Sequence, residues 1–127
     1  MKTELRIGNY IMYDNRYFQI YSISDEFPTL NTIEFGIGVV DWNNISPIPI
    51  TEELLVKCGF QYLNGRTDGE LTLDILHYEF DFVEGELVTK SRYEEVYKRE
   101  KLPHIKSLHQ LQNLFYCLCN QELTIEI

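Results

Sequence analysis

Three side chains that can ligate metals or exchange protons recur at alternate positions late in the chain. His77, Glu79 and Asp81 supply one imidazole and two carboxylates. In a strand they would share one face, with successive Cα atoms about 6.5–7 Å apart. Two of them, with a ligand from elsewhere, would suit zinc or manganese. Alternation also places polar residues on a solvated sheet face. The sequence favours that interpretation, so we predict neither a metal site nor a cofactor.

The other two histidines do not form a catalytic arrangement. Leu108 lies four residues after His104, and Asn113 lies four residues after His109, so neither has a second strong ligand at helical spacing. We expect each imidazole to be hydrogen-bonded to the backbone at a buried or interfacial position, and not to act as a catalytic base.

The three cysteines leave an odd thiol if any pair forms. Cys117 and Cys119 are two apart on a predicted helix, so their side chains point about 200° apart and cannot easily bond to each other or share a metal. An apolar helical context raises the pKa of a thiol, which disfavours a nucleophile. We therefore expect free thiols, including Cys58, in a reducing compartment, and no enzymatic activity.

The helix that carries two of these cysteines is unusual because it lacks charge. Residues 107–121 contain no Asp, Glu, Lys or Arg, although the whole chain is 24% charged. One face is an apolar stripe at helical spacing, formed by Leu108, Leu111, Phe115 and Leu118. The opposite face is polar but uncharged, with His109, Gln112, Asn113, Tyr116 and Asn120. We expect a helix from Ser107 to about Cys119, covered on more than one side by its own domain or by a partner.

The first fifty residues show a β pattern. Strands are expected at 9–13, 16–24 and 32–41, with a loop at 26–31. Asp14 and Asn15 suit a tight hairpin turn because both tolerate positive φ. Gly36 and Gly38 permit a sharp bend, as in a small, partly closed barrel. Tyrosines such as Tyr17 and Tyr21 could stack bases or sugars, but core and cross-strand packing explains them more simply.

The next segment predicts a short helix. Thr51 is a suitable N-cap and Gly59 a suitable residue beyond its end, with Leu54, Leu55 and Cys58 facing inward.

The apolar phase of residues 71–83 then slips between Ile75 and Leu76, which predicts a bulge or a break. Residues 84–86 read as a turn before a returning strand. At 91–101 a helix is favoured over a strand, because Ser91 and Glu94 form a capping box. Residues 123–127 alternate as a terminal strand.

The totals restrict the partners. The 127 residues fit one domain with an adequate core, and the net charge is −9. Binding a phosphate backbone needs a basic patch, yet the strongest basic cluster is Lys98 and Arg99 with Lys101, among glutamates. Nucleic-acid binding is therefore disfavoured. The N-terminus lacks the apolar core of a signal peptide and no run has membrane-spanning length, so a cytoplasmic location without membrane contact is expected.

Two segments resemble known families. Leu5-Arg6-Ile7-Gly8-Asn9-Tyr10 and the hairpin after it resemble the opening of small SH3-like barrels. Residues 51–60, and above all His109-Gln-Leu-Gln-Asn-Leu-Phe-Tyr116 with Glu122-Leu-Thr-Ile, resemble uncharacterised small proteins of anaerobic gut bacteria and their phages and prophages. The resemblance implies a domain of unknown function without catalytic residues. That family usually has Ala-Leu-Thr-Gly at positions 117–120, so Asn120 would take the place of the C-cap glycine.

We therefore predict an α+β protein. Residues 1–50 would form an SH3-like, partly open β-barrel subdomain. Residues 51–127 would form an α+β subdomain: a short helix, an antiparallel hairpin sheet and the C-terminal helix packed on it. The favoured function is a non-enzymatic protein-interaction or structural module of phage or mobile-element origin. Its contact residues for a protein partner or a second copy would be His109, Gln112, Asn113 and Tyr116.

Two alternatives stay open from the sequence. One is a small metal-binding domain or enzyme that uses the His77, Glu79 and Asp81 face. The other is an acidic inhibitor of a nucleic-acid enzyme, which the excess of carboxylates would serve.

Overall fold

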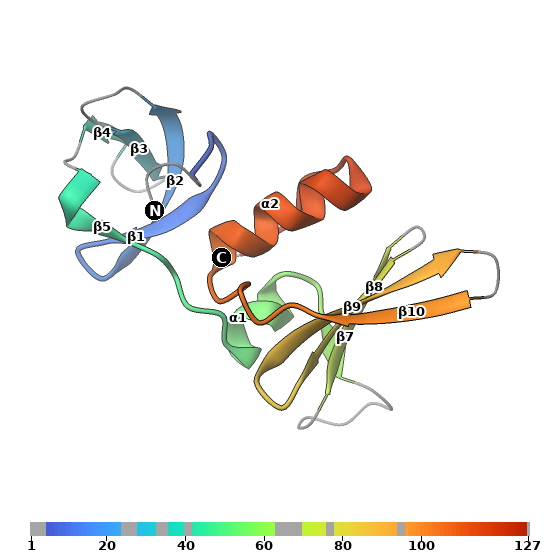
Figure 1. Ribbon diagram of the computed structural model, residues 1–127. Coiled ribbons are helices and arrows are strands. Elements are labelled where there is room, and N and C mark those ends of the chain that lie inside the picture. The colour runs from blue at the N-terminus through green and yellow to red at the C-terminus, as the bar shows by residue number, and fades with distance from the viewer. Residues whose placement is uncertain are drawn as a thin grey trace. The chain divides into compact units, whose positions relative to one another are not determined.

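The structure is a computed structural model that describes residues 5–23, 28–32, 36–39, 42–62, 70–75, 78–93 and 96–126. For 28–32, 36–39, 91–93 and 96–99 it describes the backbone alone. The described residues form two antiparallel sheets and two α-helices, which confirms the predicted α+β class (Figure 1). The chain divides into two compact units. Unit 1 comprises Met1–Pro49 with Ser107–Asn113, and unit 2 comprises Ile50–Lys106 with Leu114–Ile127.

The sheet of unit 1 has the strand order β4-β3-β2-β1-β5. Its strands are β1 (Tyr10–Tyr13), β2 (Arg16–Ile23), β3 (Pro28–Thr32), β4 (Gly36–Val39) and β5 (Ile45–Ser46). Asp14 and Asn15 connect β1 to β2 with φ of 51° and 59°, the two positive values that a type I′ hairpin turn requires. The hairpin predicted at this pair is confirmed.

Two strand predictions in this sheet were wrong. Pro28–Thr32 forms β3 where a loop was expected, because β2 is long enough to pair with it, and Pro28 occupies the first position, where a missing N–H is tolerated. The single strand expected at 32–41 does not form either, since Thr32 pairs with Gly36 across a reversal of the chain. Among the described pairings none joins β4 to β5, so the SH3-like barrel stays a prediction.

The core of unit 1 lies on one face of its sheet. Leu5, Ile11, Ile20 and Ile45 are buried together. Tyr13 and Phe18 pack against these residues. Their two rings contact each other edge to face, with centroids 5.7 Å apart. Trp42, in a short 3₁₀ helix η2 (Trp42–Asn44), covers the same cluster.

The sheet of unit 2 has the order β10-β9-β8-β7-β6. Its strands are β6 (Gln61–Tyr62), β7 (Leu71–Ile75), β8 (Tyr78–Val83), β9 (Glu86–Tyr93) and β10 (Val96–Lys101). Ile75 pairs with Tyr78, so the phase slip marks a break at which the chain reverses. The turn predicted at residues 84–86 is confirmed by Glu84 and Gly85, whose φ values are 52° and 80°.

The helix predicted at 91–101 is wrong. Ser91–Tyr93 end β9, and β10 pairs along it from Val96 opposite Tyr93 to Lys101 opposite Val88. Helical side-chain pairs such as Glu94 with Lys98 contribute only about 0.2–0.5 kcal/mol each. Tyr and Val have strong strand preferences, and six consecutive residues of β10 find partners in β9. Long-range pairing therefore outweighs the local helix signal.

The two helices match their predictions. Helix α1 (Glu52–Lys57) is capped at its N-terminus by Thr51, whose hydroxyl accepts the Leu54 N–H at 3.2 Å, and its C-cap Cys58 is followed by Gly59, with φ of 95°. Helix α2 (Leu108–Cys119) ends at Asn120, whose φ of 53° is that of a left-handed C-cap. The first half of α2 belongs to unit 1 and the second half to unit 2, whereas the sequence-based division had assigned the whole helix to residues 51–127.

The second half of α2 packs on its sheet through aromatic side chains. Phe115 contacts Phe80 of the central strand β8, with ring centroids 5.7 Å apart. Leu71 and Leu87 on the neighbouring strands are buried with them.

The terminal strand predicted at 123–127 is wrong for residues 123–126, which form no strand. Ile127 lies outside the described residues. Leu123 is buried and Ile125 is half-buried, so packing alone accounts for the alternation. The backbone bond found here joins Glu126 N–H to the Lys57 carbonyl at 2.8 Å.

Candidate functional site

The uncharged face of α2 is built into unit 1 through the carboxamide of Gln112. Its Oε1 accepts the Tyr10 N–H at 2.8 Å, and its Nε2 donates to the Gly8 carbonyl at 3.1 Å. These backbone groups lie on the edge of β1 beyond β5, which pairs only with Met12 and Tyr13. The side chain therefore bonds this edge as a strand residue would. Gln112 is 2% exposed, so both bonds are protected from water.

The turn that precedes β1 fits the same helix. Asn9 N–H donates to the Arg6 carbonyl, and Gly8 has φ of 97°, the value that a type II turn requires at its third residue. The buried Asn9 side chain accepts the Arg6 N–H at 2.9 Å and donates to Asn113 Oδ1 at 2.9 Å. The polar groups of this turn and of the helix thus satisfy one another.

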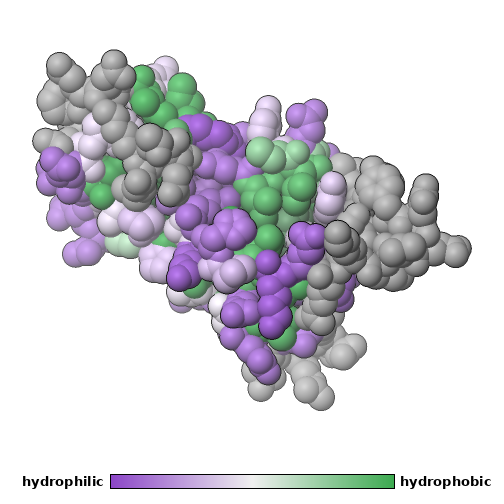
Figure 2. Space-filling view, in the orientation of Figure 1, coloured by the Kyte–Doolittle hydropathy of each residue, from purple (hydrophilic) through white to green (hydrophobic). Residues whose placement is uncertain are grey.

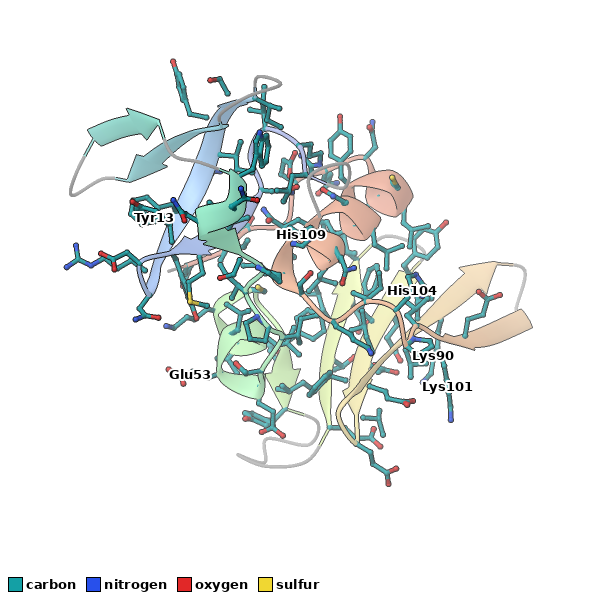
Figure 3. The ribbon with its side chains drawn as sticks, turned by 60° about the vertical axis from the view of Figure 1, so that its left-hand side comes forward. Tyr13, Glu53, Lys90, Lys101, His104 and His109 are labelled. Carbon is teal, nitrogen blue, oxygen red and sulfur yellow. The ribbon has the colours of Figure 1, made fainter. Side chains whose placement is uncertain are left out.

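The four residues predicted as a contact surface differ in accessibility. His109 is buried, and its Nδ1 lies 3.1 Å from Ser107 Oγ (Figure 3). Gln112 is buried and Asn113 is half-buried, and both are hydrogen-bonded within unit 1. Tyr116, in unit 2, is 43% exposed. The first half of the helix is therefore covered by its own unit, one of the two explanations for its missing charge.

The acidic strand face holds an ionic cluster. Asp81 is 4% exposed, although it lies among the alternate polar residues of β8. It accepts the Thr72 hydroxyl at 2.7 Å, and Lys90 Nζ lies 3.2 Å from its other carboxylate oxygen. The same ammonium lies 3.0 Å from Glu79, directly opposite Lys90 in the sheet. Figure 3 shows Lys90 on β9. The register of three strands brings these groups together.

Burial and charge shift the proton equilibria of this cluster. Removal from water raises the pKa of Asp81, while the Thr72 and Lys90 hydrogen bonds oppose that rise. Hydrogen bonds to Glu79 and Asp81 raise the pKa of Lys90. His77 lies outside the described residues, and within those residues no group of three His, Cys, Asp or Glu is placed to hold a metal. The ammonium occupies the position between two carboxylates that a cation would take.

The thiols are free and mostly inaccessible. Cys58 is buried, and burial raises its pKa to about 12. Cys119 is also buried, with its pKa raised for the same reason, while Cys117 is exposed. A protonated, buried thiol is a poor nucleophile. His104 is exposed, in the turn that follows β10.

An exposed and uncharged surface lies on the outer side of β1 and β2. Alternation turns Ile11, Phe18 and Ile20 inward, so the intervening residues point outward. We call this outer surface the tyrosine face; its members are Tyr10, Met12, Tyr17, Gln19 and Tyr21. It ends at Tyr21, because the register of β2 against β3 shifts between Ile20 and Ser22. Tyr17 and Tyr21 are 39% and 56% exposed. Figure 2 shows hydrophobic residues, in green, reaching the surface of unit 1.

The sequence-based expectation of core packing missed this surface. Tyr13 and Phe18 do join the core, whereas Tyr17 and Tyr21 do not. Their parity relative to Ile20 carried the signal, because residues at odd separation from a buried strand residue face the other side.

Unit 2 also contains a cavity of about 420 Å³. Apolar residues such as Ile50, Phe82 and Leu102 line it, together with Glu86 and Lys106, and more of its surface is polar than apolar. No histidine, cysteine or serine is among its lining residues.

Comparisons with known proteins give no relative. No family model, no curated protein and no solved structure matches this chain. In the part of the chain that the structure describes, no helix is long and apolar enough to cross a membrane.

Proposed function

We propose that this protein is a non-enzymatic interaction module, and that the tyrosine face of unit 1 is its contact surface. The observation that carries the proposal is the exposure of Tyr17 and Tyr21 on one side of β2. Tyrosine is enriched in protein interfaces because it offers a large, rigid contact area and a polar tip. The face includes no Asp, Glu, Lys or Arg, and interface centres are depleted of such residues.

Three of the groups suited to catalysis are engaged in other contacts or buried. The two carboxylates of β8 are paired with Lys90, and the buried thiol of Cys58 is held protonated. These contacts favour a binding module over an enzyme. We place the contact surface on the sheet of unit 1 and not on the helix face expected from the sequence, because Gln112 and His109 are buried.

We also propose a cytoplasmic protein of phage or mobile-element origin. The support is the resemblance of the α2 sequence to small proteins of gut anaerobes and their phages, with Asn120 at the helix C-cap. Inspection of the gene neighbourhood tests this part. Adjacent tail, head or replication genes would support it, and a neighbourhood of unrelated housekeeping genes would contradict it.

A pair of matched variants tests the surface. Tyr21→Ser removes the ring from the tyrosine face, whereas Tyr116→Ser removes a similarly exposed ring from the helix. Tagged protein of each form is used to capture proteins from a lysate that contains an untagged copy. We expect wild type and Tyr116→Ser to retain the same proteins and Tyr21→Ser to lose them. Equal capture by all three forms, or capture by none, contradicts the proposal.

A further inference from the structure

We infer that the partner of the tyrosine face is a second copy of this chain. The inference rests on the proposed function and names the occupant of that surface. Charge selects the occupant, since the face is neutral in a protein of net charge −9.

The strands of unit 1 are almost free of charge. Across β1 to β5 the only charged residue is Arg16, next to the hairpin turn. The strands of unit 2 contain ten: Asp74, Glu79, Asp81, Glu86, Lys90, Arg92, Lys98, Arg99, Glu100 and Lys101. The uncharged surface is therefore a property of one sheet and not of the whole chain.

Two acidic copies repel each other unless they meet where carboxylates are absent. Facing like charges across an interface costs several kcal/mol, and the tyrosine face presents none. A strongly basic partner would be attracted to carboxylates, which this face does not offer. A neutral aromatic surface is complementary to itself, so a two-fold pair can form with the same residues on both sides.

The exposed area predicts a weak dimer. A tyrosine side chain can bury about 150–250 Å², so the exposed fractions of Tyr17 and Tyr21 together offer on the order of 150–250 Å². A standard interface needs about 800 Å² from each partner. We therefore expect reversible association that depends on concentration, and not a permanent dimer.

The dependence of this association on salt concentration distinguishes it from binding to a basic partner. The contact itself contains no ion pair to weaken, while the net charge of −9 on each copy opposes approach. Added salt screens that repulsion, so the dimer should become more stable as ionic strength rises. An acidic protein that bound a basic partner would show the opposite dependence.

Sedimentation equilibrium of the purified full chain tests the inference. It is run over a range of protein concentrations at about 0.02 M and about 0.5 M NaCl. The Debye length is about 10 Å at 0.1 M, so charges on the two copies are weakly screened at the lower salt and strongly screened at the higher. We expect a monomer–dimer equilibrium whose association constant rises several-fold at the higher salt. Tyr21→Glu should weaken it by about tenfold or more, an effect that corresponds to about 1.4 kcal/mol. Tyr116→Glu should leave it unchanged.

Circular dichroism and thermal unfolding verify that each variant folds. If Tyr21→Glu does not fold, Tyr17→Ser replaces it, because that residue is exposed on the same face. A dimer that weakens with salt, or one that Tyr116→Glu disrupts, overturns the inference. A monomer at all concentrations overturns it as well. In that case, capture of another protein that depends on Tyr21 leaves the proposed function standing, and absence of such capture ends both.

Discussion

The two sheets satisfy their buried polar groups in different ways. In unit 1 the partners are neutral amides: Gln112 bonds the free edge of β1, and Asn9 bonds Asn113. In unit 2 the partners are ions, with Lys90 between Glu79 and Asp81. Amides do not titrate, whereas carboxylates do. The hydrogen bonds of the Gln112 and Asn9 amides are therefore insensitive to acid, whereas the ion pairs of Lys90 are sensitive to it.

The two sheets also differ in the charge of their exposed side chains. In unit 1 the outward side chains of β1 and β2, from Tyr10 to Tyr21, are neutral, and Arg16 lies at the other parity beside the turn. In unit 2 the exposed charges of Glu100 and Lys101 lie on the edge strand β10, where charge disfavours pairing with another chain.

The largest expected effect is on the amide side of this comparison. Gln112→Leu leaves the Tyr10 N–H without its partner at a buried edge and removes one of the two side-chain donors to the Gly8 carbonyl. We expect a loss of about 3 kcal/mol in the free energy of unfolding, since an unsatisfied buried group costs about 1–3 kcal/mol and a lost hydrogen bond about 0.5–1.5 kcal/mol. Urea denaturation near pH 7 and near pH 4 measures it, and the loss should be the same at both.

The control variant changes a second glutamine that also donates a hydrogen bond to the Gly8 carbonyl. Gln19 is exposed and also donates to the Gly8 carbonyl, at 3.2 Å. Gln19→Ala should cost less than about 0.5 kcal/mol, as exposed substitutions usually do. Equal losses for the two variants would show that burial of the Gln112 amide does not matter.

The next largest effect comes from removing the ion pairs of unit 2. Lys90→Met removes the cation that two carboxylates share, and we expect a loss of about 2 kcal/mol near pH 7, reduced from buried-pair values because the lysine is partly exposed. The loss should shrink as the pH falls and the carboxylates take up protons. Denaturation at the two pH values measures it, with Lys101→Met, an exposed neighbour in the sheet, as the control. A loss that persists unchanged in acid would contradict the ionic account.

A smaller effect concerns the sign of the pH dependence. The folded-state pKa of Asp81 lies above its ordinary value of 3.8, so the folded state holds this proton more tightly than the unfolded state does. Its ionisation therefore lowers stability as the pH rises from about 3.8 to the raised folded value, and the contribution is constant above it. Asp81→Asn keeps an acceptor for Thr72 and should remove this decline, with stability near pH 7 within about 1 kcal/mol of wild type.

Thermal unfolding across that pH range, compared with the exposed Asp74→Asn, isolates the contribution. A decline of the same size in Asp81→Asn and in wild type would assign it to other groups.

The smallest perturbation is chemical labelling of the thiols. It reports the opening of unit 2 alone, because this unit contains all three cysteines. A thiol-reactive dye should label one cysteine quickly in the native protein, Cys117, because the others are buried. Cys58 and Cys119 should react only at the rate of local or global opening. Mass spectrometry of digested, labelled protein identifies the sites. Fast labelling of Cys58 in the folded protein would show that the core of unit 2 is open.

Local signals predicted the parts of the fold that depend on neighbouring residues. Asp14 and Asn15 gave the first hairpin, and Thr51 with Gly59 gave the ends of α1, because turns and caps depend on a few adjacent side chains. The segment 91–101 was misassigned because its structure depends on pairing with β9, which local propensity does not contain.

The candidate sites show the same limit. The missing charge correctly indicated burial for the first half of α2 only, since Tyr116 and Cys117 in the second half are exposed. The cover of the first half is 102 and 104 residues away along the chain, at Tyr10 and Gly8. The partner of Asp81 was likewise invisible, because Lys90 reaches it only through the register of β8 and β9. Contacts of this kind are set by topology, which spacing along one segment does not encode.

The composition of unit 1 has a consequence for biosynthesis. Its sheet is made early, but Ser107–Asn113 belong to it as well and leave the ribosome nearly sixty residues after Pro49. Until then the edge of β1 has no Gln112, and the nascent chain exposes unpaired backbone groups beside a sheet that almost lacks charge. Unit 1 must therefore finish folding late, and termination of synthesis before residue 112 would release an aggregation-prone fragment.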